Sequence, residues 1–255
     1  EMKKEIDIEY KGEPAKWSEI FGPTIRYRTL LGMAIMSFQQ LSGCNYFFYY
    51  GNNIFQQIKI TDSYVASIIL GLVNFICTFI SLYVMQKFGR RLPLIISSVW
   101  MFVCFIIFAT VGSTKLILPD GSADRTSGII MIVFVCLYIF GFATTWAPGA
   151  FVIVGETYPI KLRSKCSAVA TSSAWIWNFC ISFLTPFITK QIGFKYGYVF
   201  AVCCLIGGAI VFFFAKETKN LTLEEISELY ARTDIKPWRS AGFKSDRIRL
   251  PSNDP

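Results

Sequence analysis

The chain has 255 residues, of which 53% are hydrophobic and 16% aromatic, and it carries a formal net charge of +8. This composition is too apolar for an ordinary soluble domain. The basic residues lie at the ends of the apolar runs, so the charge does not indicate a nucleic-acid-binding protein. Histidine is absent, which excludes imidazole-based catalysis and most zinc sites. We therefore expect no metal and no cofactor.

Six charge-free runs follow one another along the chain, and each is long enough to cross a bilayer, which takes about 20 apolar residues. They are residues 29–58, 63–86, 92–114, 126–155, 166–189 and 196–215. The pattern predicts an all-α membrane protein with six transmembrane helices. The loops after the second and fourth runs are the basic ones, and the positive-inside rule places them, with both termini, in the cytosol.

Three regions are expected from this pattern. Residues 1–28 form a partly helical cytosolic connector, and residues 29–215 form the transmembrane bundle. Residues 216–255 form a cytosolic segment with one short amphipathic helix, for which Thr222 and Glu225 have the spacing of a capping box. From Lys236 the composition favours a disordered tail.

The middle of the first run, around Gly43, contains three side-chain amides, those of Gln39, Gln40 and Asn45. An unpaired amide in hydrocarbon costs several kcal/mol, so these groups must face another helix, a water-filled cavity or a polar ligand. On an ideal helix Asn45 points about 120° away from Gln39, so all three meet one ligand only if the helix bends near Gly43. Amides donate and accept hydrogen bonds, as sugar hydroxyls do. Hydrogen bonds between helices are the alternative reading.

The fourth run is interrupted by the segment Thr144-Thr145-Trp146-Ala147-Pro148-Gly149, because proline removes a backbone hydrogen bond and clashes with the preceding turn. Runs one and four are thus the long, interrupted ones, runs two and five each contain an asparagine (Asn74 and Asn178), and runs three and six are plainly apolar. This order predicts a 3+3 inverted repeat. Paired broken helices in such a repeat indicate a transporter binding site at the repeat interface.

Four motifs carry a resemblance to a known family. They are Gln39-Gln40-Leu41-Ser42-Gly43 with Asn45 and Tyr49-Tyr50, Gly89-Arg90-Arg91, the segment from Glu156 to Arg163, and Glu217-Thr218-Lys219 with Glu224-Glu225. At these motifs the chain resembles the sugar porter family of the major facilitator superfamily, and most closely the yeast-type hexose transporters. The resemblance implies the C-terminal half of a twelve-helix fold, with part of the central connector in front and the N-terminal six helices missing.

The resemblance also implies roles for particular residues. Expected sugar-binding residues are Gln39, Gln40, Asn45, Asn74, Phe142, Phe151, Trp175 and Asn178. Expected gate residues are Tyr49, Tyr50, Pro148 and Gly149. Expected members of a cytosolic ion-pair cluster, with Glu156 as the shared acid, are Arg90, Arg91, Glu156 and Arg163. The plainer alternatives are polar or aromatic packing, an interfacial aromatic belt, and solvated loop charges that fix the topology.

The chain departs from the family pattern at four positions. Phe151 stands where the family has tryptophan, Ala174 replaces an asparagine, Gln86 replaces an acid, and Lys216 replaces the proline that opens the Pro-Glu-Thr-Lys signature. The first two positions belong to the expected sugar pocket, so they bear on affinity or substrate choice. The last two belong to the cytosolic gate.

The leading hypothesis is a non-enzymatic hexose carrier of the plasma membrane that works by alternating access. Its partners are a hexose, the lipid bilayer and the missing N-terminal six-helix half, without which this chain is a non-transporting remnant. No acid lies inside a run away from its ends, which favours facilitated diffusion over proton coupling. A sugar-binding sensor is the alternative, and an intramembrane enzyme is disfavoured by the absence of histidine and of an embedded acid pair.

Overall fold

The computed structural model describes residues 16–23, 25–48, 63–116, 124–232 and 234–243, and all regular structure in them is helical. The elements are η1 (Trp17–Phe21), α2 (Arg26–Leu41), α4 (Ser63–Phe88), α5 (Arg91–Thr114), α6 (Arg125–Gly141), η2 (Phe142–Trp146), α7 (Ala147–Thr157), α8 (Ile160–Ile192), η3 (Gly193–Lys195), α9 (Tyr196–Phe214), α10 (Leu223–Ala231) and η4 (Pro237–Arg239). This confirms the expected all-helical class.

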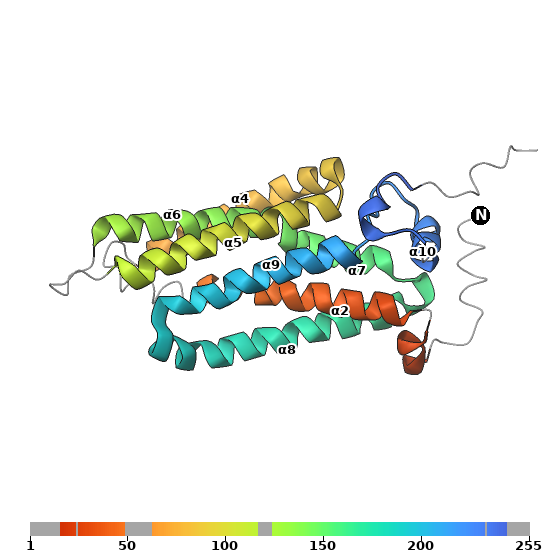
Figure 1. The fold of residues 1–255 in the computed structure, drawn as a ribbon, viewed down its shortest axis with the longest axis horizontal. Coiled ribbons are helices and arrows are strands. Elements are labelled where there is room, and N and C mark those ends of the chain that lie inside the picture. The colour runs from red at the N-terminus through yellow and green to blue at the C-terminus, as the bar shows by residue number, and fades with distance from the viewer. Residues whose placement is uncertain (1–15, 24, 49–62, 117–123, 233, 244–255) are drawn as a thin grey trace, which may run out of the picture.

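Four helical stretches in the described residues are long and apolar enough to cross a membrane: Ile68–Phe88, Arg91–Thr114, Arg125–Thr157 and Ile160–Phe214. The last stretch has 55 residues and contains both α8 and α9, which turn back on each other at η3 (Figure 1). Helix α2 has 16 described residues, which is shorter than a full span. The four stretches therefore coincide with runs two to six, and six separate transmembrane helices stay a prediction.

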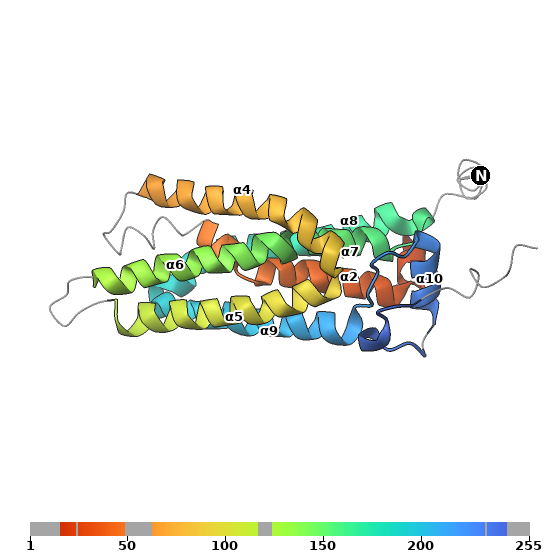
Figure 2. The same ribbon diagram turned by 90° about the horizontal axis from the view of Figure 1, so that it is seen from above.

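The long helices lie side by side in an elongated bundle (Figures 1 and 2). Helix α5 packs along α9 and along α6, and α2 packs along α8. Helix α10 lies across the end of the bundle at which α2 begins and where α4 turns into α5 (Figure 1). The charged motifs that precede α5 and follow α9 therefore lie at the same end of the bundle, beside α10.

The predicted bend in the first run is present at Gly43. Helix α2 ends at Leu41, Gly43 adopts a φ of +89°, and the helix resumes at Cys44. A Cβ atom at Gly43 would lie 2.7 Å from ring atoms of Phe105 and of Phe200. Only glycine suits both the positive φ and this close approach. After the bend, the helical turn that begins at Cys44 packs into an aromatic core, in which Tyr46 is buried.

The expected interruption of the fourth run takes the form of a π-helical turn: α6 ends at Gly141, η2 covers Phe142–Trp146 and α7 begins at Ala147, with no gap in the helical stretch. The missing N–H of Pro148 is accommodated by the π-helical turn η2, in which the Ala147 N–H reaches back to the Phe142 carbonyl. The Thr145 hydroxyl donates to the Gly141 carbonyl at 2.6 Å, and that of Thr144 donates to Phe140 at 2.7 Å. Threonine hydroxyls and π turns are known ways to satisfy backbone groups around proline in membrane helices.

The segment after α9 is more ordered than its composition indicates. The capping box of Thr222 and Glu225 at the start of α10 is confirmed. The prediction of a disordered tail from Lys236 is wrong for residues 236–243, which contain η4. This segment is held in place because Trp238 stacks on Phe212, with 6.2 Å between the ring centroids, and because Ser240 is buried. The remaining tail and residues 1–15 lie outside the described residues.

Candidate functional site

The Gln39 carboxamide is buried between the bend of the first run and the π turn of the fourth. Its Nε2 donates to the carbonyl oxygens of Ala147 at 3.1 Å and of Trp146 at 3.4 Å. Its Oε1 is buried and accepts no hydrogen bond from the described residues. An unsatisfied buried acceptor costs about 1–3 kcal/mol, so this oxygen is a site at which a ligand hydroxyl or a water would be stabilised.

The other two amides near Gly43 contact each other rather than Gln39. The Asn45 Nδ2 donates to the Gln40 Oε1 at 2.5 Å, and both side chains are partly buried. The turn at Gly43 brings these two residues together although five positions separate them. The bend thus forms one amide pair, Gln40 and Asn45, and one separate amide, Gln39.

Two aromatic residues that sequence reasoning did not assign to the site hold the bend and the π turn. The Tyr138 hydroxyl donates to the Ser42 carbonyl at 2.8 Å, and Phe142 stacks on the Tyr138 ring at 6.3 Å between centroids. The Trp146 indole N–H donates to the Ser98 hydroxyl at 2.9 Å. The rings of Tyr138 and Trp146 are both buried. No motif identifies them, because a buried aromatic has the same sequence signal as ordinary core packing.

The remaining expected sugar-binding residues lie on other helices. Trp175 on α8 is 66% exposed and Phe151 on α7 is 54% exposed, while Asn74 on α4 and Asn178 on α8 are partly buried. No described hydrogen bond joins these four to the amides of the first run.

The four expected gate residues divide into two pairs. Pro148 lies in the first turn of α7. Gly149 packs closely against Leu94 and Met85, because a Cβ there would lie 3.1–3.2 Å from their side chains. Tyr49 and Tyr50 lie outside the described residues.

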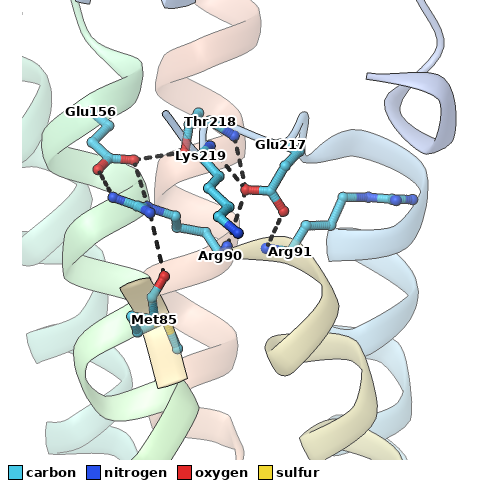
Figure 3. A network of polar contacts seen from close by, with 7 residues as sticks. All are labelled: Met85, Arg90, Arg91, Glu156, Glu217, Thr218 and Lys219. Carbon is cyan, nitrogen blue, oxygen red and sulfur yellow. Dashed lines mark hydrogen bonds and ion pairs between the residues drawn. The ribbon is translucent and has the colours of Figure 1, made fainter. Parts of the chain in front are cut away.

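A second polar group lies at the end of the bundle near α10, and we call Arg90, Glu156, Glu217 and Thr218 the charged cluster (Figure 3). The Arg90 guanidinium binds Glu156 through two contacts, Nη2 to Oε1 at 2.7 Å and Nε to Oε2 at 3.2 Å. The Thr218 hydroxyl donates to the same carboxylate at 2.6 Å. Such a two-point pair is stronger and more directional than a single contact.

Glu217 binds main-chain groups rather than another side-chain charge. It accepts the N–H of Arg90 at 3.0 Å and of Arg91 at 3.1 Å, and its Oε1 also accepts the N–H groups of Thr218 and Lys219 at 3.1 Å each. The carboxylate therefore ties the chain after α9 to the start of α5. The motif Glu217-Thr218-Lys219 was visible in the sequence, although the expected cluster did not include it.

Arg91 and Arg163 do not bind Glu156 in the described contacts. The Arg91 Nη2 donates to the Phe212 carbonyl at 2.7 Å, and the Arg163 Nη2 is 3.4 Å from the Tyr158 carbonyl. Of the expected cluster, the structure thus brings Arg90 and Glu156 together and directs the other two arginines to carbonyl groups.

Two buried cations hold α10 against the bundle, and neither was assigned to the site from the sequence. The Arg28 Nη2 donates to the Ser227 carbonyl at 2.7 Å. The Lys216 Nζ donates to the carbonyls of Leu229 at 3.0 Å and Arg232 at 2.8 Å. Burial lowers the pKa of Lys216. The Leu229 and Arg232 carbonyls lie at the C-terminal end of α10, where a cation satisfies unpaired acceptors.

Comparisons with known proteins give related sequences and structures. A family model described as "Sugar (and other) transporter" matches residues 1–230. The high-affinity glucose transporter ght2 of Schizosaccharomyces pombe is 58% identical over 95% of this chain and 46% of its own length. The high-affinity fructose transporter ght6 of the same organism is 54% identical over 99% of this chain and 47% of its own length.

A solved structure of the major facilitator superfamily proton:xylose symporter XylE, bound to 6-bromo-6-deoxy-D-glucose, superposes with a TM-score of 0.68. It is 25% identical to this chain, and the match covers 79% of this chain and 42% of the symporter. The chain therefore spans about half the length of the proteins it matches.

Proposed function

Because the chain belongs to the sugar (and other) transporter family, we propose that it forms the C-terminal half of a hexose transporter. In this proposal residues 29–215 form six transmembrane helices in a 3+3 inverted repeat, preceded by the connector 1–28 and followed by the cytosolic segment 216–255. The partner is an N-terminal six-helix half, and the match to about half of each relative supports it. The sugar binds between the halves, which open alternately to the two sides.

The observation that carries the proposal is the arrangement of the three amides around the Gly43 bend. Gln39 offers a buried acceptor with no partner in the described residues, and the pair of Gln40 and Asn45 offers further donors and acceptors nearby in the chain. A neutral solute with many hydroxyls can satisfy such groups without bringing charge into the membrane. The proposed substrate is therefore a glucose-like monosaccharide.

The other proposed sugar contacts are Asn74, Asn178, Trp175, Phe142 and Phe151. The exposed Trp175 and Phe151 rings offer apolar faces to the C–H face of a sugar ring. Tyr49, Tyr50, Pro148 and Gly149 are the proposed gate residues. The charged cluster at the other end favours one access state by holding α7, the α4–α5 turn and the chain after α9 together.

Hexose uptake in a transporter-deficient yeast strain tests the proposal, with the chain in its full-length protein. We expect Gln39→Ala and Asn45→Ala to reduce uptake by at least tenfold, since each removes a polar contact worth about 1.5 kcal/mol. Gln191→Ala, the same change at an exposed position of α8, is the matched control and keeps wild-type uptake. Normal uptake by both amide variants at normal expression would refute the proposal.

The same assay separates transport from sensing. A transporter carries labelled hexose across the membrane, whereas a sensor binds the sugar without net flux. We propose facilitated diffusion, because the acids among the described residues lie at helix ends or outside the spans. Uptake is then insensitive to a protonophore, and inhibition by the protonophore would indicate proton coupling instead.

The proposed location is the plasma membrane, with both termini in the cytosol. The basic residues around α10 and the α4–α5 turn lie at one end of the bundle (Figure 1), which the positive-inside rule assigns to the cytosol. An epitope placed at the C-terminus should be accessible to antibody only after the cells are permeabilised.

A further inference from the structure

A lateral cavity of about 340 Å³ lies between α4, α5 and α6. Large apolar side chains form its rim: Phe88, Leu92, Ile96, Trp100 and Phe140. Each of these side chains is exposed, between 44% and 60%. The cavity therefore opens on the outer surface of these helices, in the part of the chain that the structure describes.

The polar groups in the cavity wall are already satisfied from within the protein. The Thr145 Oγ1 lies 2.6 Å from the Ser97 hydroxyl oxygen, and the Thr144 hydroxyl donates to the Phe140 carbonyl at 2.7 Å. The occupant is thus offered apolar surface and no free hydrogen-bond donor from these two threonines. This favours a hydrocarbon chain over a sugar or another polar solute.

The cavity runs along the helix axes over the depth of one bilayer leaflet. On α5 its lining extends from Leu92 to Trp100, which is about 12 Å at the helical rise of 1.5 Å per residue. Half of a hydrocarbon core of about 30 Å is about 15 Å. Leu92 lies next to the charged end of the bundle, so a lipid tail here would have its headgroup at that end.

Two ammonium groups lie beside this entrance. The Lys87 Nζ is 5.7 Å from the ring centroid of Phe88 on the cavity rim, and the Lys219 Nζ donates to the Lys87 carbonyl at 2.6 Å. In the described part of the chain neither lysine forms an ion pair with a carboxylate. At this end of the bundle these two lysines and the arginines of the Gly-Arg-Arg motif outnumber the acids Glu156 and Glu217, and the excess positive charge attracts an anionic headgroup.

We propose that the cavity binds one acyl chain of an anionic glycerophospholipid, whose phosphate lies between Lys87 and Lys219. The assignment of this end to the cytosolic leaflet rests on the proposed orientation of the transporter. The lipid site is separate from the amides around Gly43 and does not require that the protein transports sugar.

Quenching of tryptophan fluorescence tests this site, because Trp100 lies on the rim. The purified protein in detergent is titrated with phosphatidylserine or phosphatidylcholine that carries dibrominated acyl chains, and Trp100→Phe identifies the signal from the cavity. We expect saturable quenching of Trp100 at lower concentrations of phosphatidylserine than of phosphatidylcholine.

Two matched pairs of variants locate the lipid. Val84→Phe fills the cavity and should abolish Trp100 quenching, while Val99→Phe, on the exposed face of α5 outside the cavity, should preserve it. Lys87→Gln should weaken phosphatidylserine binding about fivefold, while Lys190→Gln on α8 should not.

Three outcomes would overturn the proposal. They are equal quenching in Val84→Phe and Val99→Phe, equal affinity for the two headgroups, and a change of oligomeric state in Val84→Phe without a change in quenching. The last result would assign the cavity to contact with a second copy of the protein. None of these measurements uses sugar uptake. A result that overturns the lipid proposal is therefore distinct from a result that overturns the transport proposal.

Discussion

A Cβ atom added to Gly89 would lie 2.8 Å from the Oε2 of Glu217, and Gly89 has a φ of +87°. Glycine is therefore required at this position for two reasons, the left-handed backbone and the closeness of the carboxylate. The turn at Gly89 directs the N–H groups of Arg90 and Arg91 toward the same carboxylate. The Gly-Arg-Arg motif thus acts through its backbone as much as through its charges.

Gly89→Ala should destabilise the protein by about 1–3 kcal/mol, the usual cost of a forced positive φ. Thermal unfolding in detergent measures the effect. Gly71→Ala is the control, because a Cβ at Gly71 meets nothing within 4 Å and alanine favours a helix. Equal midpoints for the two variants would contradict the role assigned to Gly89.

The contact between Arg90 and Glu156 should appear as a coupling energy in a double-mutant cycle of Arg90→Gln and Glu156→Gln. We expect about 1.5–3 kcal/mol, because the pair is charged, partly buried and joined at two points. The double variant should then lose less stability than the sum of the single variants. Strict additivity would show that the pair contributes no interaction of its own.

Gly43→Ala should cost more than about 1 kcal/mol and should lower hexose uptake. The φ of +89° disfavours alanine, and its Cβ would overlap the Phe105 and Phe200 rings. The displaced chain would separate Asn45 from Gln40. Gly155→Ala, at which a Cβ meets nothing within 4 Å, should leave unfolding and uptake unchanged, so an equal effect of the two would contradict the prediction.

Asp124 should make the start of α6 sensitive to acid. Its carboxylate accepts hydrogen bonds from the N–H groups of Thr126 and Ser127 and from the Ser127 hydroxyl, and these contacts lower its pKa. A lowered folded-state pKa gives stability that is present above the unfolded-state pKa and is lost as the pH falls through the folded-state value.

Asp124→Asn keeps an N-capping acceptor but removes the titration. The unfolding midpoint of this variant should therefore change less between pH 6 and pH 3 than that of the unmodified chain, whereas Asp124→Ala should be less stable at both pH values. Parallel pH dependence in all three proteins would show that Asp124 does not carry the effect.

The sequence predicted those features that depend on local patterns. The helical spans follow from hydrophobic runs, the start of α10 from the capping spacing of Thr222 and Glu225, and the bend from the glycine among the amides. Each is specified by neighbouring residues, so no knowledge of distant contacts was needed.

Features that depend on distant partners could not be predicted in the same way. The π turn over Phe142–Trp146 is the form that the expected interruption takes, and the hydroxyls of Thr144 and Thr145 donate to the Phe140 and Gly141 carbonyls beside it. The partner of Gln39 is a main-chain group more than 100 residues away. A helical wheel gives the direction of a side chain but not what lies opposite it.

The hydrogen bond from Gln39 to the carbonyl of Ala147 has a consequence for the divergence of related sequences. Because the acceptor is a peptide oxygen, the identity of the side chain at position 147 does not enter into the bond. That position can change during evolution without a compensating change at Gln39, provided that the turn keeps its geometry. The glutamine, in contrast, has no such freedom, since its length and its amide donor are both needed to reach the neighbouring helix.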